Sequence, residues 1–506
     1  MLSHPRRSAL APVLSLAGLL LCFGESPYAQ TLPPLAIAPG ATHLTAGDAP
    51  FLWIGDTAWE LFHRLDSGEV RHYLDTRARQ GVNVVQAVGL AELDGLRVPN
   101  ANGDVPLVGL DPAQLNEPYW AYVDWVVDEC AARGMYVALL PTWGDKFNPA
   151  SWGVGPDVFT PDNAAAFAKT LGARYADRTH VTWVLGGDRW PEDDDDRVIV
   201  AAMARGLRAG GAGQLITYHP NGARRATKYF DDDWLDYEMF QTGHDRRQLD
   251  FAYVRASREQ GSRPRPVVNA EPRYEDHPDR FDQGAYEWMD QADVRQALYW
   301  TFFAGGAGYT YGCHDVWQMW APGREAVNGA RTHWRTALGL PGAHQLDYAR
   351  DFLERTDWST YRPAQELVVY DSAVALAPTF LRASTGLSPK PAPLALRGTA
   401  ADSAQVLAAV ALDGGAVLAY APYGGSVGLR VGPVRAALGG GNPSVDQLVA
   451  AWFNPRDGRV VAAAPAVEDG GVLTVAAPSR GWGSDYVLVV YPRGSAVASA
   501  LGVARH

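Results

Sequence analysis

The feature that most constrains the fold is a regular alternation, from residue 51 onward, of short apolar runs with longer amphipathic stretches. In residues 117–133, for example, apolar side chains recur at three- and four-residue spacing, which predicts a helix that ends before Gly134. The runs predicted as strands are residues 51–56, 82–88, 135–141, 181–185, 215–219, 235–241, 266–271 and 297–303. Eight strands that alternate with helices predict an α/β fold of the (β/α)8 or TIM-barrel type.

The pattern changes after residue 363. Helical spacing stops, and short runs punctuated by glycine follow at residues 367–370, 406–412, 416–420, 472–475 and 486–491. Short strands separated by turns are typical of an antiparallel sandwich. The sequence therefore predicts a catalytic barrel over residues 31–363 and a small all-β domain over residues 364–506.

The amino terminus has the order of a secretory signal. Arg6 and Arg7 precede an apolar run at 9–23, and a more polar segment follows at 25–30. Residues 1–30 are interpreted as a signal peptide cleaved near Ala29, so the protein is expected to be secreted or periplasmic. The alternative is an uncleaved anchor, although the run is short for a membrane span. Residues 19–22 resemble a lipobox only faintly, because Leu21 stands where a small residue is wanted, so lipoprotein anchoring is not expected.

The bulk composition limits the partners. The chain of 506 residues carries a net charge of -12, which argues against nucleic acid and anionic membranes, since both call for a basic face. A mean hydropathy of -0.16 excludes a protein with many membrane spans. Two cysteines remain after the signal, Cys130 and Cys313, and they are predicted to be buried free thiols. The oligomeric state is left open.

Polar and aromatic residues gather at the predicted strands, as a sugar site requires. Sugar hydroxyls need directional hydrogen bonds, and the apolar face of the ring needs an aromatic platform. Strand-associated residues of this kind include Gln86, Asn221, His244 and His314. The residues selected as substrate contacts are Asp56, Trp59, Asn83, Trp143, Asp145, His219, Gln241 and Trp300.

Two carboxylates stand out because each ends a predicted strand, Asp188 after the fourth and Glu271 after the seventh. Retaining glycoside hydrolysis needs two carboxyl groups, one protonated to donate to the leaving oxygen and one ionised to attack the anomeric carbon. The structural alternatives are that Asp188 caps the next helix and that Glu271 pairs with Arg273.

Other motifs are weaker evidence of function. The pattern Gly-x-Ser-x-Gly at 424–428 lies in the all-β half with no helix after it, so it does not indicate a serine hydrolase. The acidic run at 192–196 is interpreted as a solvated loop that favours the start of the next helix, with cation binding as the alternative. The histidines lack the spacing of a local metal motif, so neither a metal nor a cofactor is expected.

Several longer motifs resemble the apiosidase-like glycoside hydrolases of family 140. They are FLWIGDTAW at 51–59, GVNVVQ at 81–86, WVLGGD at 183–188 and NAEPRYE at 269–275. The segments AWFNPRDG at 451–458 and DYVLV at 485–489 resemble the small β-domain, described as collagen-binding, of the same architecture. The resemblance implies a retaining mechanism with Asp188 as acid/base, Glu271 as nucleophile and apiose as the sugar. Related barrel glycosidases usually have Asn-Glu where this chain has Gly187-Asp188.

Two alternatives to this reading stay open. One is a non-catalytic carbohydrate- or matrix-binding protein that keeps the barrel as a platform. The other is a glycosidase of different sugar specificity on the same barrel.

Overall fold

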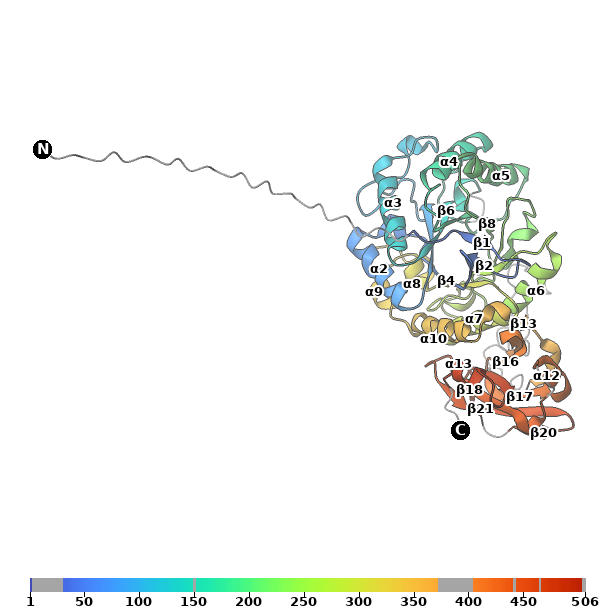
Figure 1. Cartoon of the computed structure of the whole chain (residues 1–506). Coiled ribbons are helices and arrows are strands. Elements are labelled where there is room, and N and C mark those ends of the chain that lie inside the picture. Colours follow the sequence, from blue (N-terminus) through green and yellow to red (C-terminus); the bar gives the residue numbers. More distant parts are fainter. Residues whose placement is uncertain (2–30, 149–151, 372–403, 440–442, 464–465, 503–506) are drawn as a thin grey trace.

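The computed structural model describes residue 1 and residues 31–148, 152–371, 404–439, 443–463 and 466–502. A barrel is followed by a smaller β-domain that lies against one side of it (Figure 1). Apart from Met1, the predicted signal peptide lies outside the described residues. Within the described ranges, the structure has no helix with the length and apolar character needed to cross a bilayer.

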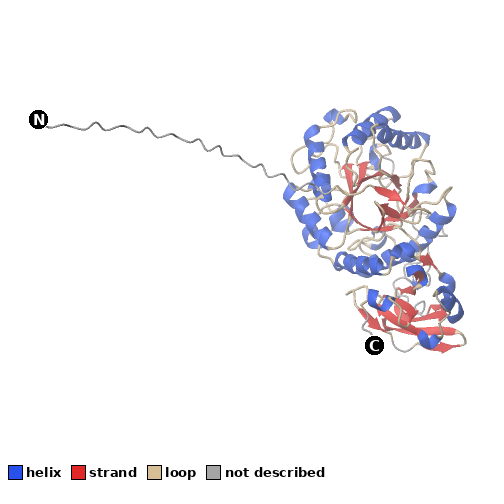
Figure 2. Cartoon of the chain, in the orientation of Figure 1, coloured by secondary structure: helices blue, strands red, loops and turns tan. Residues whose placement is uncertain are grey.

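Eight parallel strands form the barrel, which confirms the predicted fold. Figure 2 shows them as a ring enclosed by helices. The ring closes between its two end strands, where Asp236 N–H donates to Ile216 O at 2.8 Å and Thr217 Oγ1 donates to Tyr237 O at 2.6 Å. In spatial order the strands are β8 (Ile216–His219), β7 (Val181–Gly186), β6 (Tyr136–Thr142), β5 (Val84–Leu90), β4 (Trp53–Thr57), β12 (Gly308–Tyr311), β11 (Val267–Glu271) and β10 (Glu238–Gln241), with a short antiparallel β9 (Arg224–Arg225) beside β10.

The outer layer is helical, and local capping explains where its helices begin. Thr160 accepts a hydrogen bond from Asn163 N–H and precedes Pro161, the first residue of α4, as the sequence predicts. The buried Cys130, on α3, and Cys313 are free thiols, also as predicted. The helices are α1 (Leu61–Arg64), α2 (Ser67–Arg79), α3 (Glu117–Ala131), α4 (Pro161–Arg174), α5 (Asp194–Ala209), α6 (Asp250–Gln260), α7 (Gln291–Phe303), α8 (His314–Trp317), α9 (Trp334–Ala337) and α10 (Pro341–Arg355).

One predicted strand is wrong. Residues 297–303 belong to helix α7, and the eighth strand is β12, which lies after this helix in a glycine-containing stretch. Every residue of α7 except its first is buried, because the helix is enclosed by the barrel and by the β-domain. Such a helix has no polar stripe, so its apolar run resembles a buried strand.

A small antiparallel sheet closes the amino-terminal end of the barrel. It consists of β1 (Leu35–Ile37), β2 (Leu44–Ala46) and β3 (Ala49–Phe51). Leu35 and Leu44 belong to the same apolar cluster as Tyr136, the first residue of β6, whose hydroxyl donates to Pro33 O at 2.7 Å. Since this end is covered, the opposite end, where the strands finish, is the one left for a site.

The β-domain contains two antiparallel sheets, as predicted for an all-β sandwich. Val417 and Leu488 of one sheet pack with Leu429 and Leu473 of the other in a single apolar cluster. One sheet has the order β13 (Arg362–Pro363), β15 (Leu407–Ala411), β16 (Ala416–Ala421), β22 (Tyr486–Pro492), β18 (Leu448–Phe453) and β19 (Val460–Ala462); the other has β14 (Val368–Asp371), β17 (Gly424–Arg430), β21 (Val472–Arg480) and β20 (Val467–Asp469), with helices α12 (Val431–Ala437) and α13 (Val497–Ala500).

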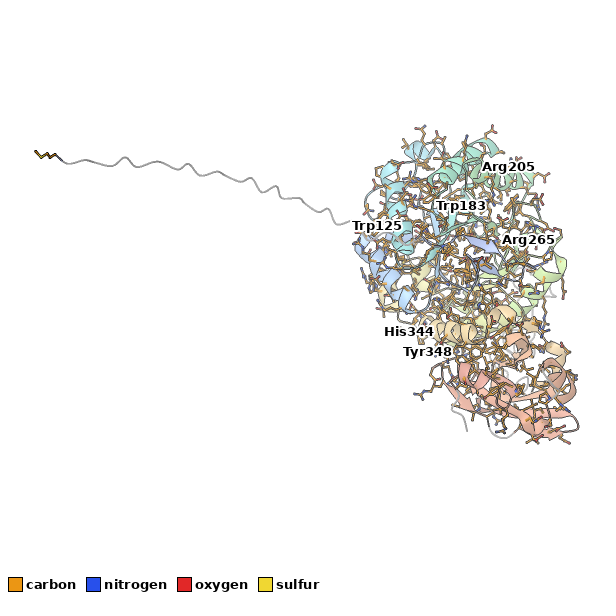
Figure 3. The ribbon with its side chains drawn as sticks, viewed as in Figure 1. Trp125, Trp183, Arg205, Arg265, His344 and Tyr348 are labelled. Carbon is orange, nitrogen blue, oxygen red and sulfur yellow. The ribbon has the colours of Figure 1, made fainter. Side chains whose placement is uncertain are left out.

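The β-domain is joined to the barrel by buried contacts. Arg295 on α7 and Asp485, just before β22, form a buried ion pair whose nearest atoms are 2.6 Å apart. Phe352 on α10 stacks on Phe453 with ring centroids 4.2 Å apart. Tyr348, labelled at the junction in Figure 3, lies so close to Gly458 that a Cβ there would be 3.0 Å from its ring. The two domains therefore share a core.

We expect Asp485→Ala to destabilise the whole protein by about 3–5 kcal/mol, because it leaves the Arg295 guanidinium buried without its partner. The side chains of this pair are only 4% and 2% exposed. Thermal unfolding followed by circular dichroism measures the effect. Glu354→Ala is the matched control, since Glu354 forms an exposed pair with Arg350 and its loss should cost under about 0.5 kcal/mol. Equal stability of the two variants would contradict a shared core.

Candidate active site

The open end of the barrel gathers the side chains that end its strands. His219, Gln241 and Glu271 are the last residues of β8, β10 and β11, and Asp188 lies two residues after β7. Glu271 is 5% exposed, and Asp188 is half-buried. Residues from distant parts of the chain thus meet where barrel enzymes place their chemistry.

The backbone that presents Asp188 is unusual. Gly186, Gly187 and Asp188 have φ values of 92°, 99° and 57°, all in the left-handed region. A Cβ on Gly187 would lie 2.9 Å from Trp143 Cα, and one on Gly186 would lie 2.6 Å from His219 O. Only glycine fits at these two positions, and a non-glycine residue held at positive φ is a strained arrangement found most often at functional sites.

The structure does not support either structural alternative for the two acids. Asp193, not Asp188, caps the next helix, because its side chain accepts from Asp196 N–H at 3.0 Å. Arg273 pairs with Asp250 and donates to Gln296 at 2.7 Å, so it is not the partner of Glu271. Both carboxyls are left available at the barrel mouth.

Two histidines contact Glu271. His219 Nε2 lies 3.3 Å from Oε2, and His244 Nε2 lies 3.2 Å from Oε1. Burial by itself would raise the pKa of Glu271, but hydrogen bonding and charge from His219 and His244 outweigh it and lower this pKa to about 2. Glu271 is therefore an anion at neutral pH and in moderately acidic solution.

Asp188 has the opposite environment. Its Oδ1 atom is buried and has no hydrogen-bond partner among the described residues. Burial, reinforced by the negative charge of Glu271, raises the pKa of Asp188 to about 6. A carboxyl with this pKa can both give and take a proton near neutral pH. Two acids at one site whose pKa values are driven apart are typical of an acid/base residue beside a permanent anion.

Further polar atoms at the mouth are buried without a hydrogen-bond partner in the described part of the chain. Native proteins rarely leave such atoms unsatisfied, so a group of them at one place indicates a site for a polar ligand. They are Trp143 Nε1, His219 Nδ1, Asn221 Oδ1, Gln241 Oε1 and His244 Nδ1. Donors and acceptors are both present, as binding of sugar hydroxyls requires.

Aromatic rings pack beside these polar atoms. The ring of Trp59 lies 5.2 Å from that of Trp143 and 5.3 Å from that of His219, measured between centroids. The structure therefore brings four of the selected contact residues, Trp59, Trp143, His219 and Gln241, to the mouth that holds Asp188 and Glu271.

Two other selected residues lie in the barrel wall or at its far end. Asp56 points outward from β4, accepts from Tyr73 Oη at 2.5 Å and pairs with Arg77 at 2.8 Å. Asn83 precedes β5, so it lies at the closed end, where its amide bonds Leu52 O and Ile54 N. The expectation that Asp56 and Asn83 contact substrate is corrected, because hydrogen bonds hold both side chains away from the mouth.

The last two selected residues also have structural partners. Asp145 is fully buried, pairs with Lys146 at 2.6 Å and accepts from Val154 and Gly155 N–H, so it shapes the loop after β6. Trp300 lies on α7 and donates to Gln405 O of the β-domain at 3.1 Å. The expectation for Trp300 fails because it rested on the wrong eighth strand.

Sequence reasoning also missed residues of the site. His244 and Asn221 were recognised at strand ends but not selected, although position alone could have found them. Tyr274, whose ring lies 4.3 Å from that of His244, belongs to the motif at 269–275 but not to the predicted contacts, and half-buried Glu92 belongs to neither. Burial and the charges of Asp188 and Asp145 hold the pKa of Glu92 well above its usual range. No sequence signal identifies this third acid, because its neighbours come from other strands.

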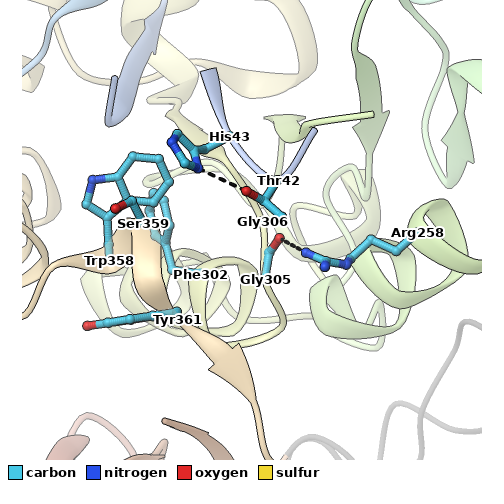
Figure 4. Close-up of a pocket in the computed structure, with 9 residues that line it drawn as sticks. All are labelled: Thr42, His43, Arg258, Phe302, Gly305, Gly306, Trp358, Ser359 and Tyr361. Atoms are coloured by element: carbon cyan, nitrogen blue, oxygen red, sulfur yellow. Dashed lines mark hydrogen bonds between the residues drawn. The ribbon is translucent and has the colours of Figure 1, made fainter. Parts of the chain in front are cut away.

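A small pocket elsewhere is unrelated to this chemistry. It lies between Thr42, Arg258, Phe302 and Trp358, and Figure 4 shows its lining. Its volume of about 10 Å³ is room for about one water molecule. Among the described residues, no group of three or more His, Cys, Asp or Glu side chains is arranged to hold a metal ion.

A parallel barrel that holds two carboxyls at its mouth, one with a raised pKa and one with a lowered pKa, has the arrangement of the barrel glycoside hydrolases. The model of the apiosidase-like catalytic domain matches residues 39–360, and the chain belongs to this family. A second model, "Putative collagen-binding domain of a collagenase", matches residues 391–491. The protein is therefore a glycoside hydrolase that carries a β-domain of this type.

Two solved structures share the fold over nearly the whole chain. A glycoside hydrolase family 5 protein from Bacteroides vulgatus is 25% identical, with a TM-score of 0.75, over 92% of this chain and 94% of its own. Another structure, described as a glycoside hydrolase, is 24% identical, with a TM-score of 0.74, over 92% and 98% of the two chains. The comparison with curated proteins gives no match.

Proposed function

We propose that this protein is a retaining glycosidase in which Glu271 is the nucleophile and Asp188 the acid/base. The observation that carries the proposal is that the pKa values of the two acids are shifted in opposite directions, to about 2 for Glu271 and to about 6 for Asp188. A permanent anion attacks, and a group that titrates near neutral pH moves the proton.

The reaction takes two steps. An oxygen of Glu271 attacks the anomeric carbon and forms a glycosyl ester, while Asp188 gives its proton to the departing glycosidic oxygen. Asp188, now a carboxylate, then takes a proton from a water molecule, whose oxygen attacks the same carbon and releases Glu271 as an anion. The low pKa of Glu271 favours its departure in this second step.

Apiose, in plant-type glycans or glycosides, is the proposed sugar, and the support for it is family membership. The buried polar atoms of Asn221, Gln241 and His244 are the proposed partners of its hydroxyls. The order of residues 1–30 supports export to the periplasm or the medium as a further part of the proposal.

A product analysis on a panel of apiosides, arabinosides and galactosides tests this function. Proton NMR during the first turnovers should show the product anomer with the configuration of the substrate. A product of inverted configuration would contradict the two-step mechanism. The absence of turnover on every member of the panel would contradict the glycosidase assignment. Preference for an arabinoside or galactoside would overturn only the sugar.

We expect His244→Gln to move the acid limb of the pH profile of kcat/KM to higher pH. His244 is one of the two histidines that lower the pKa of Glu271, so its loss should raise this pKa toward the ordinary value of about 4.3. Because a lowered pKa keeps the carboxylate ionised at acidic pH, activity should then disappear at a higher pH than in the parent. An unchanged acid limb would show that His244 does not act on Glu271.

A further inference from the structure

Two half-buried tryptophans lie beside the loop that presents Asp188. Trp190 follows Asp188 by two residues, and Trp152 comes from the loop after β6. Their ring centroids are 6.1 Å apart, with the planes tilted by 57°. Many tryptophans of the barrel, including Trp53 and Trp183, are fully buried, so a half-exposed pair at the mouth is not ordinary core packing.

Arg189 and Asn148 join the segment that carries Trp190 to the loop that carries Trp152. The guanidinium of Arg189 lies 4.4 Å from the ring of Trp152, and its Nε donates to Asn148 O at 2.9 Å. Asn148 Nδ2 in turn donates to Trp190 O at 3.2 Å. Arg189, between Asp188 and Trp190, is 1% exposed, so the backbone that carries Trp190 is fixed against the facing loop before any ligand arrives.

An open cavity begins two residues beyond Trp190, at Glu192. It has a volume of about 410 Å³, and Asn148, Asp157, Thr160, Glu192 and Asp193 are among its lining residues. Ligand sites commonly have volumes of about 300–1,000 Å³. Amide, hydroxyl and carboxylate groups around it can bond sugar hydroxyls, and Asn148, which lines it, donates to the backbone carbonyl of Trp190.

We propose that Trp152, Trp190 and this cavity form the subsite for the sugar on the leaving-group side of the bond that is cleaved. The inference rests on the proposed function, because the acid/base must contact the departing oxygen, so side chains just beyond Asp188 meet the departing unit. The tryptophan rings receive the apolar face of a pyranose ring, and the cavity accommodates its hydroxyls or a further unit.

The test compares two substrates that share apiose as the reacting sugar. Apiosyl fluoride has a leaving group without a ring, whereas an apiosyl disaccharide releases a pyranose. We expect Trp190→Ala to lower the ratio of kcat/KM for the disaccharide to that for the fluoride about tenfold, as the loss of one aromatic contact predicts. Trp190→Phe should restore most of the ratio, because it keeps an aromatic face.

Trp125→Ala is the control. Trp125 is also half-buried, but it lies on α3 in the outer layer and is labelled away from the barrel centre in Figure 3. Its ratio should equal that of the parent. An equal ratio in Trp190→Ala and the parent would overturn the subsite, because the departing sugar then gains nothing from the ring.

Binding of the released pyranose, measured by calorimetry, separates this inference from the proposed function. If the parent hydrolyses neither substrate, the proposed function fails. Weaker binding of the pyranose to Trp190→Ala than to the parent would still support the subsite, whereas equal binding to the two proteins, or no binding to the parent, would overturn it.

Discussion

Glu271→Gln is expected to lower kcat on the order of 10⁵-fold, because removal of a nucleophile eliminates the covalent route. The amide is isosteric with the carboxylate, so the fold should be retained and the thermal unfolding midpoint should stay close to that of the parent. Steady-state hydrolysis of an aryl apioside measures the loss. A rate close to that of the parent would contradict the assignment of Glu271.

Two controls make the result specific. Glu287→Gln removes a 65% exposed carboxylate on the segment after β11 and should leave the rate within about twofold of the parent. Glu271→Gly with added azide should regain turnover and yield a glycosyl azide of inverted configuration, because the small anion takes the place of the missing carboxylate. A rescue product of retained configuration would argue against attack from the side of Glu271.

Asp188→Asn is the second variant for which a large effect is expected. Poor leaving groups need a proton from the acid/base, so kcat/KM on an alkyl or sugar apioside should fall by about 10²–10⁴-fold. Fluoride departs from apiosyl fluoride without needing a proton, so the rate of the first step on this substrate should fall much less. Equal losses on both substrates would exclude Asp188 as the proton donor.

The pH profile provides an independent check on Asp188. With a pKa of about 6, Asp188 is protonated below that pH and ionised above it, so parental kcat/KM on a sugar apioside should fall as pH rises through about 6. The limb should vanish in Asp188→Asn, which cannot titrate. Asp194→Asn, an exposed change in the first turn of α5, should keep the limb unaltered.

The two acids also bear on the alternative of a non-catalytic binding protein. A protein that only binds sugar needs partners for the sugar hydroxyls. Binding alone does not require one carboxyl with a pKa raised to about 6 beside a second carboxyl with a pKa lowered to about 2. The β-domain, fixed to the barrel through Arg295 and Asp485, is built into the enzyme as part of one core. This buried junction argues against a β-domain that moves freely and serves only for adhesion.

Some errors of the sequence reading share one cause. In a parallel barrel every strand is buried on both faces, so the sequence shows no alternation that tells inward from outward side chains. Asp56 ends the predicted strand 51–56 as clearly as Glu271 ends the predicted strand 266–271, yet the pleat of β4 turns Asp56 toward Arg77 in the helical layer. Likewise, α7 is buried nearly all round, which hid its helical period.

The sequence by itself determined the alternation of strands and helices, the change to an all-β domain and the placement of Asp188 and Glu271 at strand ends. These features are local, because periodicity and glycine positions depend only on the order of neighbouring residues along the chain. Only the tertiary structure decided what surrounds each carboxyl: His219, from β8, and His244, from the loop after β10, contact Glu271, whereas Asp188 Oδ1 is buried without a partner among the described residues. Burial and charge act through space, so the pKa difference that separates acid from nucleophile arises only in the folded barrel.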